Sequence, residues 1–121
     1  TASRREVTRY AVGRWLLDEA QDVVHRAHVR AARAVGRSAV QVTLKDMKSR
    51  WGSCGPQRRM SLSWRLIMAP LEVVDYVIVH ELTHITIGDH SARFWAAVER
   101  ACPNYREHRR WLRDHGAGLE L

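Results

Sequence analysis

Five consecutive residues, His80-Glu81-Leu82-Thr83-His84, constrain the fold of this chain more than any other feature. Side chains four positions apart lie on the same face of a helix, so His80 and His84 can reach one metal ion together. Imidazole nitrogens are common ligands of Zn²⁺, and Glu81 lies beside the first histidine, where a carboxylate can accept a proton from a metal-bound water. The spacing therefore requires a helix and predicts a metal site on it.

The residues around this motif also predict a helix, from about Leu71 to Ile87. Pro70 suits the first helical turn, Glu72 suits its positive end, and Gly88 is a stop signal. Apolar side chains recur with helical spacing at Val74, Ile78, Leu82 and Ile85. We therefore expect a helix that buries one face and offers another, with both histidines and the glutamate, for chemistry.

A catalytic zinc site needs a third protein ligand and an open position. His90 is the leading candidate, because the chain can turn back after Gly88 and present it to the same ion. A downstream carboxylate is the alternative, and Glu99 and Glu107 are the available glutamates, although both fall on patterns typical of a solvated surface. Asp89 is expected to cap a helix or to accept a hydrogen bond from a ligand histidine.

The remaining pattern predicts an α+β domain with an N-terminal helix, a small sheet and C-terminal helices around the metal-binding helix. We expect one domain, residues 1–121, in which residues 1–37 are a helical part and residues 38–121 hold the sheet, the zinc helix and the C-terminal helices. Alternating apolar and polar residues predict half-buried strands at 40–45 and 59–64, separated by a turn-rich segment. The other predicted helices cover 4–35, 91–101 and 105–115.

Composition narrows the possible partners and location. The 121-residue chain has a net charge of +7 and clusters of arginine, so weak, sequence-independent binding to nucleic acid is an accessory possibility. No apolar run is long enough to cross a membrane and no secretory signal is visible, so we expect a cytoplasmic monomer. Cys54 and Cys102 are expected to be free thiols, with a bridge between them left open.

Four segments carry a family resemblance: Lys48–Cys54, Leu62–Pro70, Tyr76–His84, and His90-Ser91 followed by Phe94-Trp95. Together they resemble the YgjP-like metallopeptidases, which are related to SprT-like and other compact zincins. The resemblance covers about residues 40–111. It implies a small zincin fold, one Zn²⁺ per chain bound by His80, His84 and His90, and Glu81 as the catalytic acid and base.

The function that the motif and the resemblance imply is zinc-dependent hydrolysis of peptide bonds in a peptide or protein substrate, with Glu81 as the general base. Two alternatives stay open: a DNA-associated SprT-like protease, suggested by the charge, and a zinc-stabilised binding module without catalysis. A second group that stabilises the developing oxyanion is usual in such sites. The sequence does not choose among the candidates Tyr76, Tyr105, Arg106, His108 and His115.

The segment around Gly52 has two interpretations. In the arrangement that the resemblance implies, a strand edge borders the cleft beside the zinc helix, a substrate peptide pairs with that edge, and Gly52 permits close backbone approach. In the other, the segment is a tight turn with Trp51 packed in the core.

Overall fold

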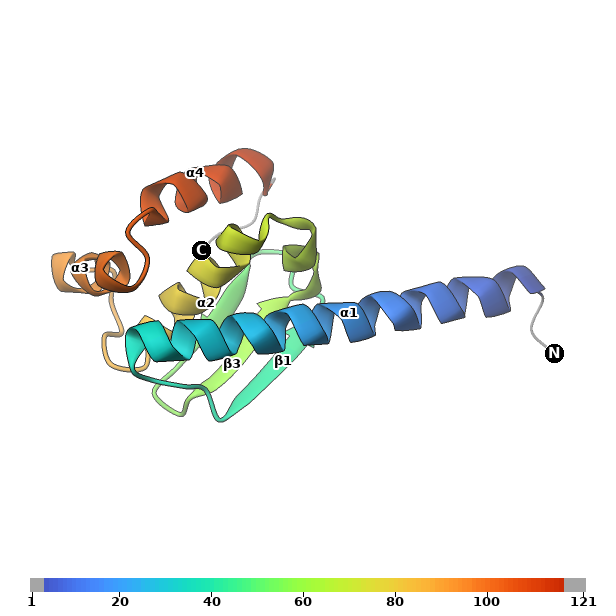
Figure 1. Ribbon diagram of the computed structural model, residues 1–121, viewed down its shortest axis with the longest axis horizontal. Helices are drawn as coiled ribbons and strands as arrows, with labels where there is room; N and C mark the ends of the chain where they lie inside the picture. The colour runs from blue at the N-terminus through green and yellow to red at the C-terminus, as the bar shows by residue number, and fades with distance from the viewer. Residues whose placement is uncertain (1–3, 117–121) are drawn as a thin grey trace.

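The fold is α+β, and the described residues form four α-helices, a short 3₁₀ helix and a small mixed sheet (Figure 1). The computed structural model describes residues 4–116, and for residues 4–17 only the helical backbone is described. The elements follow in the order α1 (Arg4–Val35), β1 (Gln41–Lys45), β2 (Gly52–Cys54), β3 (Arg59–Ser63), the 3₁₀ helix η1 (Trp64–Met68), α2 (Leu71–Thr83), α3 (Ala92–Ala101) and α4 (Tyr105–His115). The predicted fold class is therefore confirmed.

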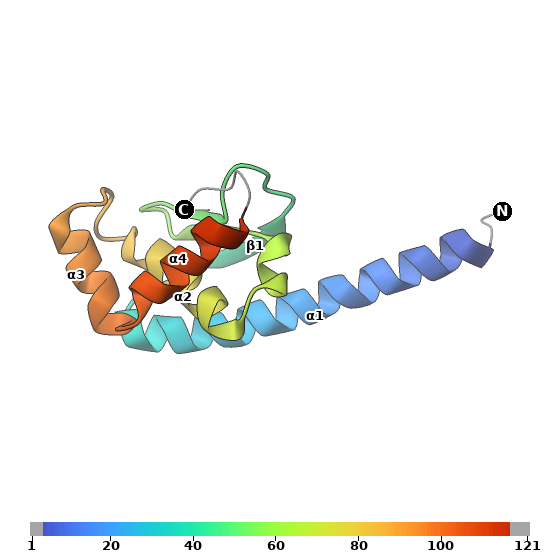
Figure 2. The same ribbon diagram turned by 90° about the horizontal axis from the view of Figure 1, so that it is seen from above.

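Helix α1 packs along α2 with its C-terminal half and extends beyond the other elements toward the N-terminus (Figure 2). Its contact face consists of small and β-branched residues at helical spacing, all buried: Ala20, Val24, Ala27 and Ala31. Gly36 follows the helix with a φ of 82°, and its N–H donates to the carbonyl of Ala32 at 2.8 Å. This left-handed glycine ends α1, as the sequence predicted.

The three strands form one sheet in the order β1-β3-β2. Strands β1 and β3 are parallel, whereas β2 and β3 are antiparallel, with Gly52 opposite Leu62 and Cys54 opposite Met60. The two predicted strands therefore lie side by side but in parallel, and the antiparallel pair before helix α2 consists of β2 and β3. Strand β2 lies at one edge of the sheet, so within residues 4–116 no strand lies beside the edge of β2 that faces away from β3.

Two sequence predictions for this region are wrong in detail. Residues Gly52–Cys54 form β2, although their residue types are typical of a turn, because pairing with β3 outweighs weak local propensity. Trp64 was expected to continue the second strand but begins η1. The hydroxyl of Ser63 accepts a hydrogen bond from the N–H of Arg65 at 3.3 Å and so caps η1 where the strand ends.

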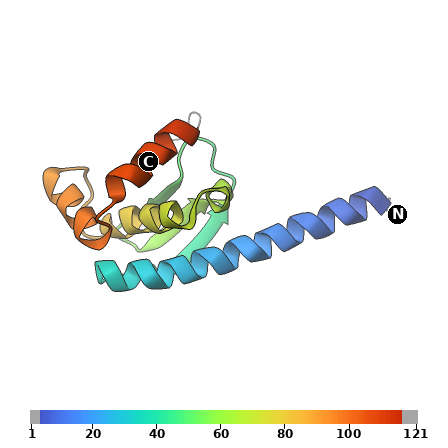
Figure 3. The ribbon, with the colours of Figure 1, turned by 45° about the horizontal axis from the view of Figure 1, so that its top comes forward.

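Helix α2 is the centre of the molecule and lies between α1 and α4 (Figure 3). It also contacts β2 and α3, so residues 76–83 are all buried, including His80 and Glu81. The expectation that α2 would bury one face only is wrong, because elements pack on it from several sides. The helix also ends at Thr83 rather than Ile87.

The two C-terminal helices match their predicted positions. Ser91 caps α3, where its hydroxyl accepts a hydrogen bond from the N–H of Phe94 at 3.4 Å. Helix α4 packs on α2 through its buried residues Tyr105 and Leu112. Among residues 4–116, no helix is long and apolar enough to cross a membrane.

Candidate metal centre

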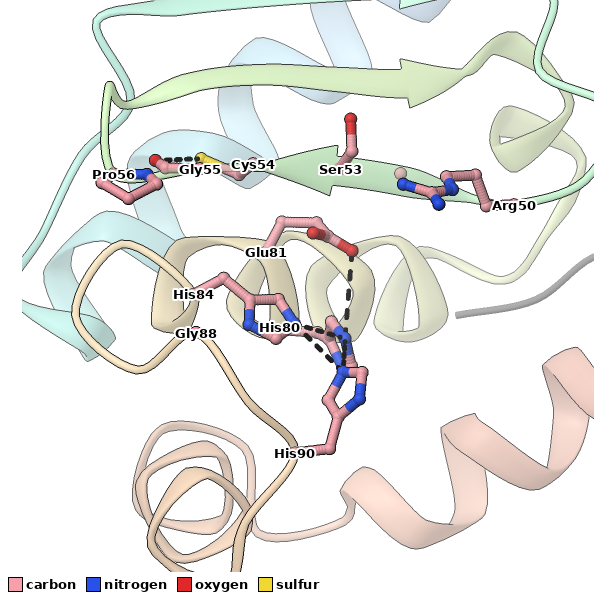
Figure 4. Close-up of a pocket in the computed structure, with 11 residues that line it drawn as sticks. Arg50, Ser53, Cys54, Gly55, Pro56, His80, Glu81, His84, Gly88 and His90 are labelled. Carbon is pink, nitrogen blue, oxygen red and sulfur yellow. Dashed lines mark hydrogen bonds and ion pairs between the residues drawn. The ribbon is translucent and has the colours of Figure 1, made fainter.

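Three histidine side chains converge at the C-terminal end of α2 (Figure 4). Their Nε2 atoms are 3.3 Å apart between His80 and His84, 3.1 Å between His84 and His90, and 3.2 Å between His80 and His90. Nitrogens bound tetrahedrally at 2.0–2.1 Å from one ion would be about 3.3 Å apart. The three donors therefore have the spacing of one face of a metal tetrahedron, as the sequence spacing predicted.

The orientation of His84 depends on the early end of α2. His84 occupies the C-cap position, and the chain beyond Thr83 turns so that the carbonyl of Ile87 faces the imidazole. The Nδ1 atom of His84 is 3.0 Å from that carbonyl oxygen, a contact in which the ring N–H donates. Because Nδ1 carries the proton, the lone pair of Nε2 is free to bind a metal. A helix continuing to Ile87 would not offer this acceptor.

His80 is buried beneath the site, with 1% of its surface exposed. Burial lowers its pKa most, the neighbouring rings of His84 and His90 lower it in the same direction, and together these effects bring it to about 3. The neutral imidazole that results is the form that binds a metal. On the other side of the ring, Nδ1 lies 3.5 Å from the hydroxyl of Tyr76, whose own pKa is raised by burial.

His90 comes from the loop between α2 and α3 and is exposed. Its ring stacks on the indole of Trp95 and meets the ring of Phe94 edge-on, with centroids 5.8 and 5.0 Å away. Asp89 accepts a hydrogen bond from the N–H of Ser91 at 3.4 Å, but the cap of α3 is Ser91 rather than Asp89. Helix α3 thus supplies the two aromatic side chains against which the ring of His90 packs.

Glu81 lies beside the histidines, with its Oε2 4.0 Å from Nε2 of His80. Only 3% of its surface is exposed. Burial raises the pKa of Glu81 to about 8, and the positive charge of Arg50 partly opposes this. A carboxyl group with a pKa near neutrality can both accept and release a proton during one reaction cycle.

Strand β2 approaches Glu81 closely at Gly52. A Cβ atom at Gly52 would lie 2.9 Å from Cδ2 of Leu62 and 3.3 Å from Cγ of Glu81. The absence of a side chain therefore lets the sheet edge lie against the carboxylate. The strand edge of the first interpretation is present, as β2, and the tight turn of the second is not, although Trp51 is packed in the core as that interpretation expected.

A cleft of about 470 Å³ separates β2 and the following turn from the histidines. Its walls are formed by Arg50, Gly52, Ser53, Cys54, Gly55, Pro56, His80, Glu81, His84, Gly88 and His90 (Figure 4). Neither Arg50 nor Ser53 is a functional candidate by residue type or spacing. Only the position of β2 at the sheet edge places them in the cleft.

The five candidates for a second oxyanion-stabilising group do not line this cleft. Tyr76 is buried beneath His80, and the other four belong to α4. The alternative metal ligands are also elsewhere: Glu99 forms an exposed ion pair with Arg106 at 3.1 Å, and Glu107 is exposed. Cys54 and Cys102 are free, as expected, and burial raises the pKa of the Cys54 thiol to about 11.

The family model described as "YgjP-like, metallopeptidase domain" matches residues 1–115. The chain belongs to the YgjP-like metallopeptidase family. The crystal structure of the metallopeptidase zymogen abylysin of Pyrococcus abyssi is similar in fold, with a TM-score of 0.65 and 19% sequence identity. The similarity covers 84% of this chain and 99% of that one. No curated protein sequence matches the chain.

Family membership agrees with the geometry described above. A metallopeptidase needs a metal held by a few side chains next to an open cleft, and the three-histidine cluster lies at such a cleft. The resemblance read from the four sequence segments is confirmed by the match, and the α+β fold is shared with a metallopeptidase of known structure.

Proposed function

We propose that the protein is a zinc-dependent peptidase in which His80, His84 and His90 bind one Zn²⁺ and Glu81 is the general base. The observation that carries this proposal is the convergence of three Nε2 atoms, 3.1–3.3 Å apart, beside a buried carboxylate. Three neutral imidazoles suit Zn²⁺, which favours tetrahedral coordination by nitrogen and sulfur.

The arrangement supports catalysis rather than a structural metal site. A structural zinc site is closed by four protein ligands. Among the side chains described, residues 18–116, the group that could hold a metal consists of three histidines only. All three histidines line the cleft, so a metal that they held would be accessible to water and to a peptide.

In the proposed reaction, Glu81 is the residue that moves the proton. When bound, the zinc ion acidifies a water molecule and polarises the peptide carbonyl. Glu81 accepts the proton of the attacking water and then delivers it to the nitrogen of the leaving amine. The position of Glu81 suits this double role, since its carboxylate lies 4.0 Å from Nε2 of His80 and lines the cleft that a substrate would enter.

The edge of β2 supplies a surface for the substrate backbone. An extended peptide that pairs with Gly52–Cys54 would lie across the cleft with the histidines on its other side. The proximity of Gly52 to Glu81 would bring the paired backbone near the base. We propose a peptide or protein as the substrate on these grounds.

Metal analysis combined with cleavage-site profiling tests the proposal. The purified protein is expected to contain about one zinc per chain and to cleave members of a proteome-derived peptide library. Removal of the metal with a chelator should abolish cleavage, and added Zn²⁺ should restore it. A zinc-loaded protein that cleaves no member of the library would contradict the proposed activity.

A further inference from the structure

One charged side chain in the cleft is not used by the proposed chemistry. Arg50 precedes β2, is exposed and lines the cleft opposite the histidines. In Figure 4 its guanidinium lies on the β2 side of the cleft, above the carboxylate of Glu81. We propose that Arg50 binds a carboxylate group of the peptide substrate and so makes the enzyme selective for acidic peptides. This inference rests on the proposed function.

The guanidinium of Arg50 is available for such a contact. Other arginines are held by acidic side chains: Arg30 pairs with Asp75 at 2.8 Å, and Arg65 pairs with Asp46. Among the described side chains, no acidic group lies within ion-pair distance of Arg50. A guanidinium presents several N–H donors in a planar fork that matches a carboxylate.

The other charges of the cleft favour the same ligand. Glu81 is the one acidic residue among those lining the cleft, and its carboxylate is buried against His80 rather than turned to solvent. A bound metal would add further positive charge at the histidines. The accessible part of the cleft is therefore positive, which attracts an anionic substrate and repels a cationic one.

The position of Arg50 predicts where the carboxylate should be. Gly52 is the residue of β2 nearest to Glu81, and Arg50 precedes it by two positions. Two residues of extended chain span roughly 7 Å. A peptide paired with β2 would therefore place a side chain near Arg50 about two residues from the bond that is cleaved.

Matched peptides test this proposal. Peptides that the zinc-loaded enzyme cleaves are made with Glu, Gln or Lys at each position within three residues of the cleaved bond. Charge-assisted hydrogen bonds of this kind predict a preference for Glu over Gln of about tenfold in kcat/KM at one of these positions. Arg50→Gln should reduce that ratio to about one, and Arg50→Glu should reverse it in favour of Lys.

Lys48→Gln is the control, because it removes one exposed positive charge two residues away and outside the residues that line the cleft. It should keep the preference for Glu. The proposal would be overturned if the wild-type and Arg50→Gln enzymes had the same ratio of kcat/KM for Glu over Gln peptides. It would also be overturned if Arg50→Gln and Lys48→Gln reduced that ratio equally.

Each peptide is also made with a free and an amidated C-terminus. A preference for Glu over Gln that survives amidation assigns Arg50 to the Glu side chain, as proposed. A preference that amidation abolishes would overturn this assignment.

A binding measurement separates this inference from the proposed peptidase activity. Zinc-loaded Glu81→Gln protein is titrated with labelled Glu and Gln peptides, with and without the additional change Arg50→Gln. Tighter binding of the Glu peptide that depends on Arg50 supports the carboxylate site even if no peptide is cleaved. Equal binding of the two peptides to the protein that retains Arg50 would overturn it.

Discussion

The indole of Trp95 lies nearly parallel to the imidazole of His90, with ring centroids 5.8 Å apart and an angle of 25° between the planes. His90 is the exposed member of the three histidines and comes from a loop, so it needs support from elsewhere to keep its position. Trp95 itself stacks on Tyr105 at 5.3 Å, and the guanidinium of Arg109 lies 4.4 Å from its ring centroid. Helices α3 and α4 together therefore orient the third histidine of the cluster.

This relationship predicts that Trp95→Leu weakens zinc binding by about tenfold, because residues that orient metal ligands typically contribute 10–100-fold to affinity. Competition with a zinc-binding dye measures the loss, and the visible spectrum of the cobalt-substituted protein reports the changed geometry.

Trp111→Leu provides the control for that experiment. Trp111 stacks on His115 with centroids 4.3 Å apart, but it does not line the metal cleft. Both variants lose a stacked indole, and only Trp95→Leu should change metal affinity and the cobalt spectrum. Equal metal affinity in the two variants would contradict a positioning role for Trp95.

The assignment of the third ligand predicts opposite results for two kinds of substitution. His90→Ala should reduce zinc content strongly at low free metal, because it removes one of three donors. Glu99→Ala and Glu107→Ala should keep wild-type zinc content, since Glu99 is paired with Arg106 on the surface and Glu107 is exposed. The reverse pattern, measured by metal analysis after dialysis against a zinc buffer, would show that the ligand set is wrong.

Gly52→Ala should destabilise the protein by about 1–3 kcal/mol, the range typical of an extra methyl group in a packed region. The new Cβ would be 2.9 Å from Leu62 and 3.2 Å from the backbone oxygen of Ser61, so the sheet must shift. Gly55→Ala is the matched control, because a Cβ there meets nothing within 4 Å. Urea denaturation compares the two, and an equal free energy of unfolding for both variants would refute the close-approach argument.

His28 predicts a pH dependence of stability that is independent of the metal centre. Its Nε2 accepts a hydrogen bond from the N–H of Ala39 at 3.0 Å, which requires a neutral ring. Burial lowers the pKa of His28 below its ordinary value of 6.5, and the nearby His25 lowers it further. As pH falls below about 6.5, the unfolded chain takes up a proton first, so His28 makes the folded state progressively less stable.

The measurement is the free energy of unfolding between pH 8 and pH 5, compared with His28→Gln and His25→Gln. Glutamine can accept the same hydrogen bond but does not titrate, so His28→Gln should lose less stability at acid pH than the wild-type protein. His25→Gln, which replaces an exposed ring, should retain most of the dependence. A wild-type pH profile in His28→Gln would contradict this account.

The strongest sequence predictions were those based on periodicity and on spacing. Each of these predictions follows from a pattern within one segment of the chain. They are the helix that carries the HExxH motif, the convergence of His80, His84 and His90, and the helices at 4–35, 91–101 and 105–115. A strand edge at β2 was expected only from the family resemblance, because three residues among turn-forming neighbours carry no period, and pairing with β3 makes them a strand. Tertiary packing likewise decides which side chains support the site. Nothing in the local sequence places Arg50 in the cleft or Trp95 against His90.

The central claim is that Glu81 transfers protons at a zinc site built by the three histidines, and the substitution Glu81→Gln tests it most directly. The amide is nearly isosteric with the carboxylate but cannot accept the proton of the attacking water. We predict that Glu81→Gln retains about one zinc per chain while its peptide hydrolysis falls by about 10²–10⁴-fold, the usual contribution of a general base. A zinc-loaded Glu81→Gln protein that cleaves the same peptide at the wild-type rate would contradict the account.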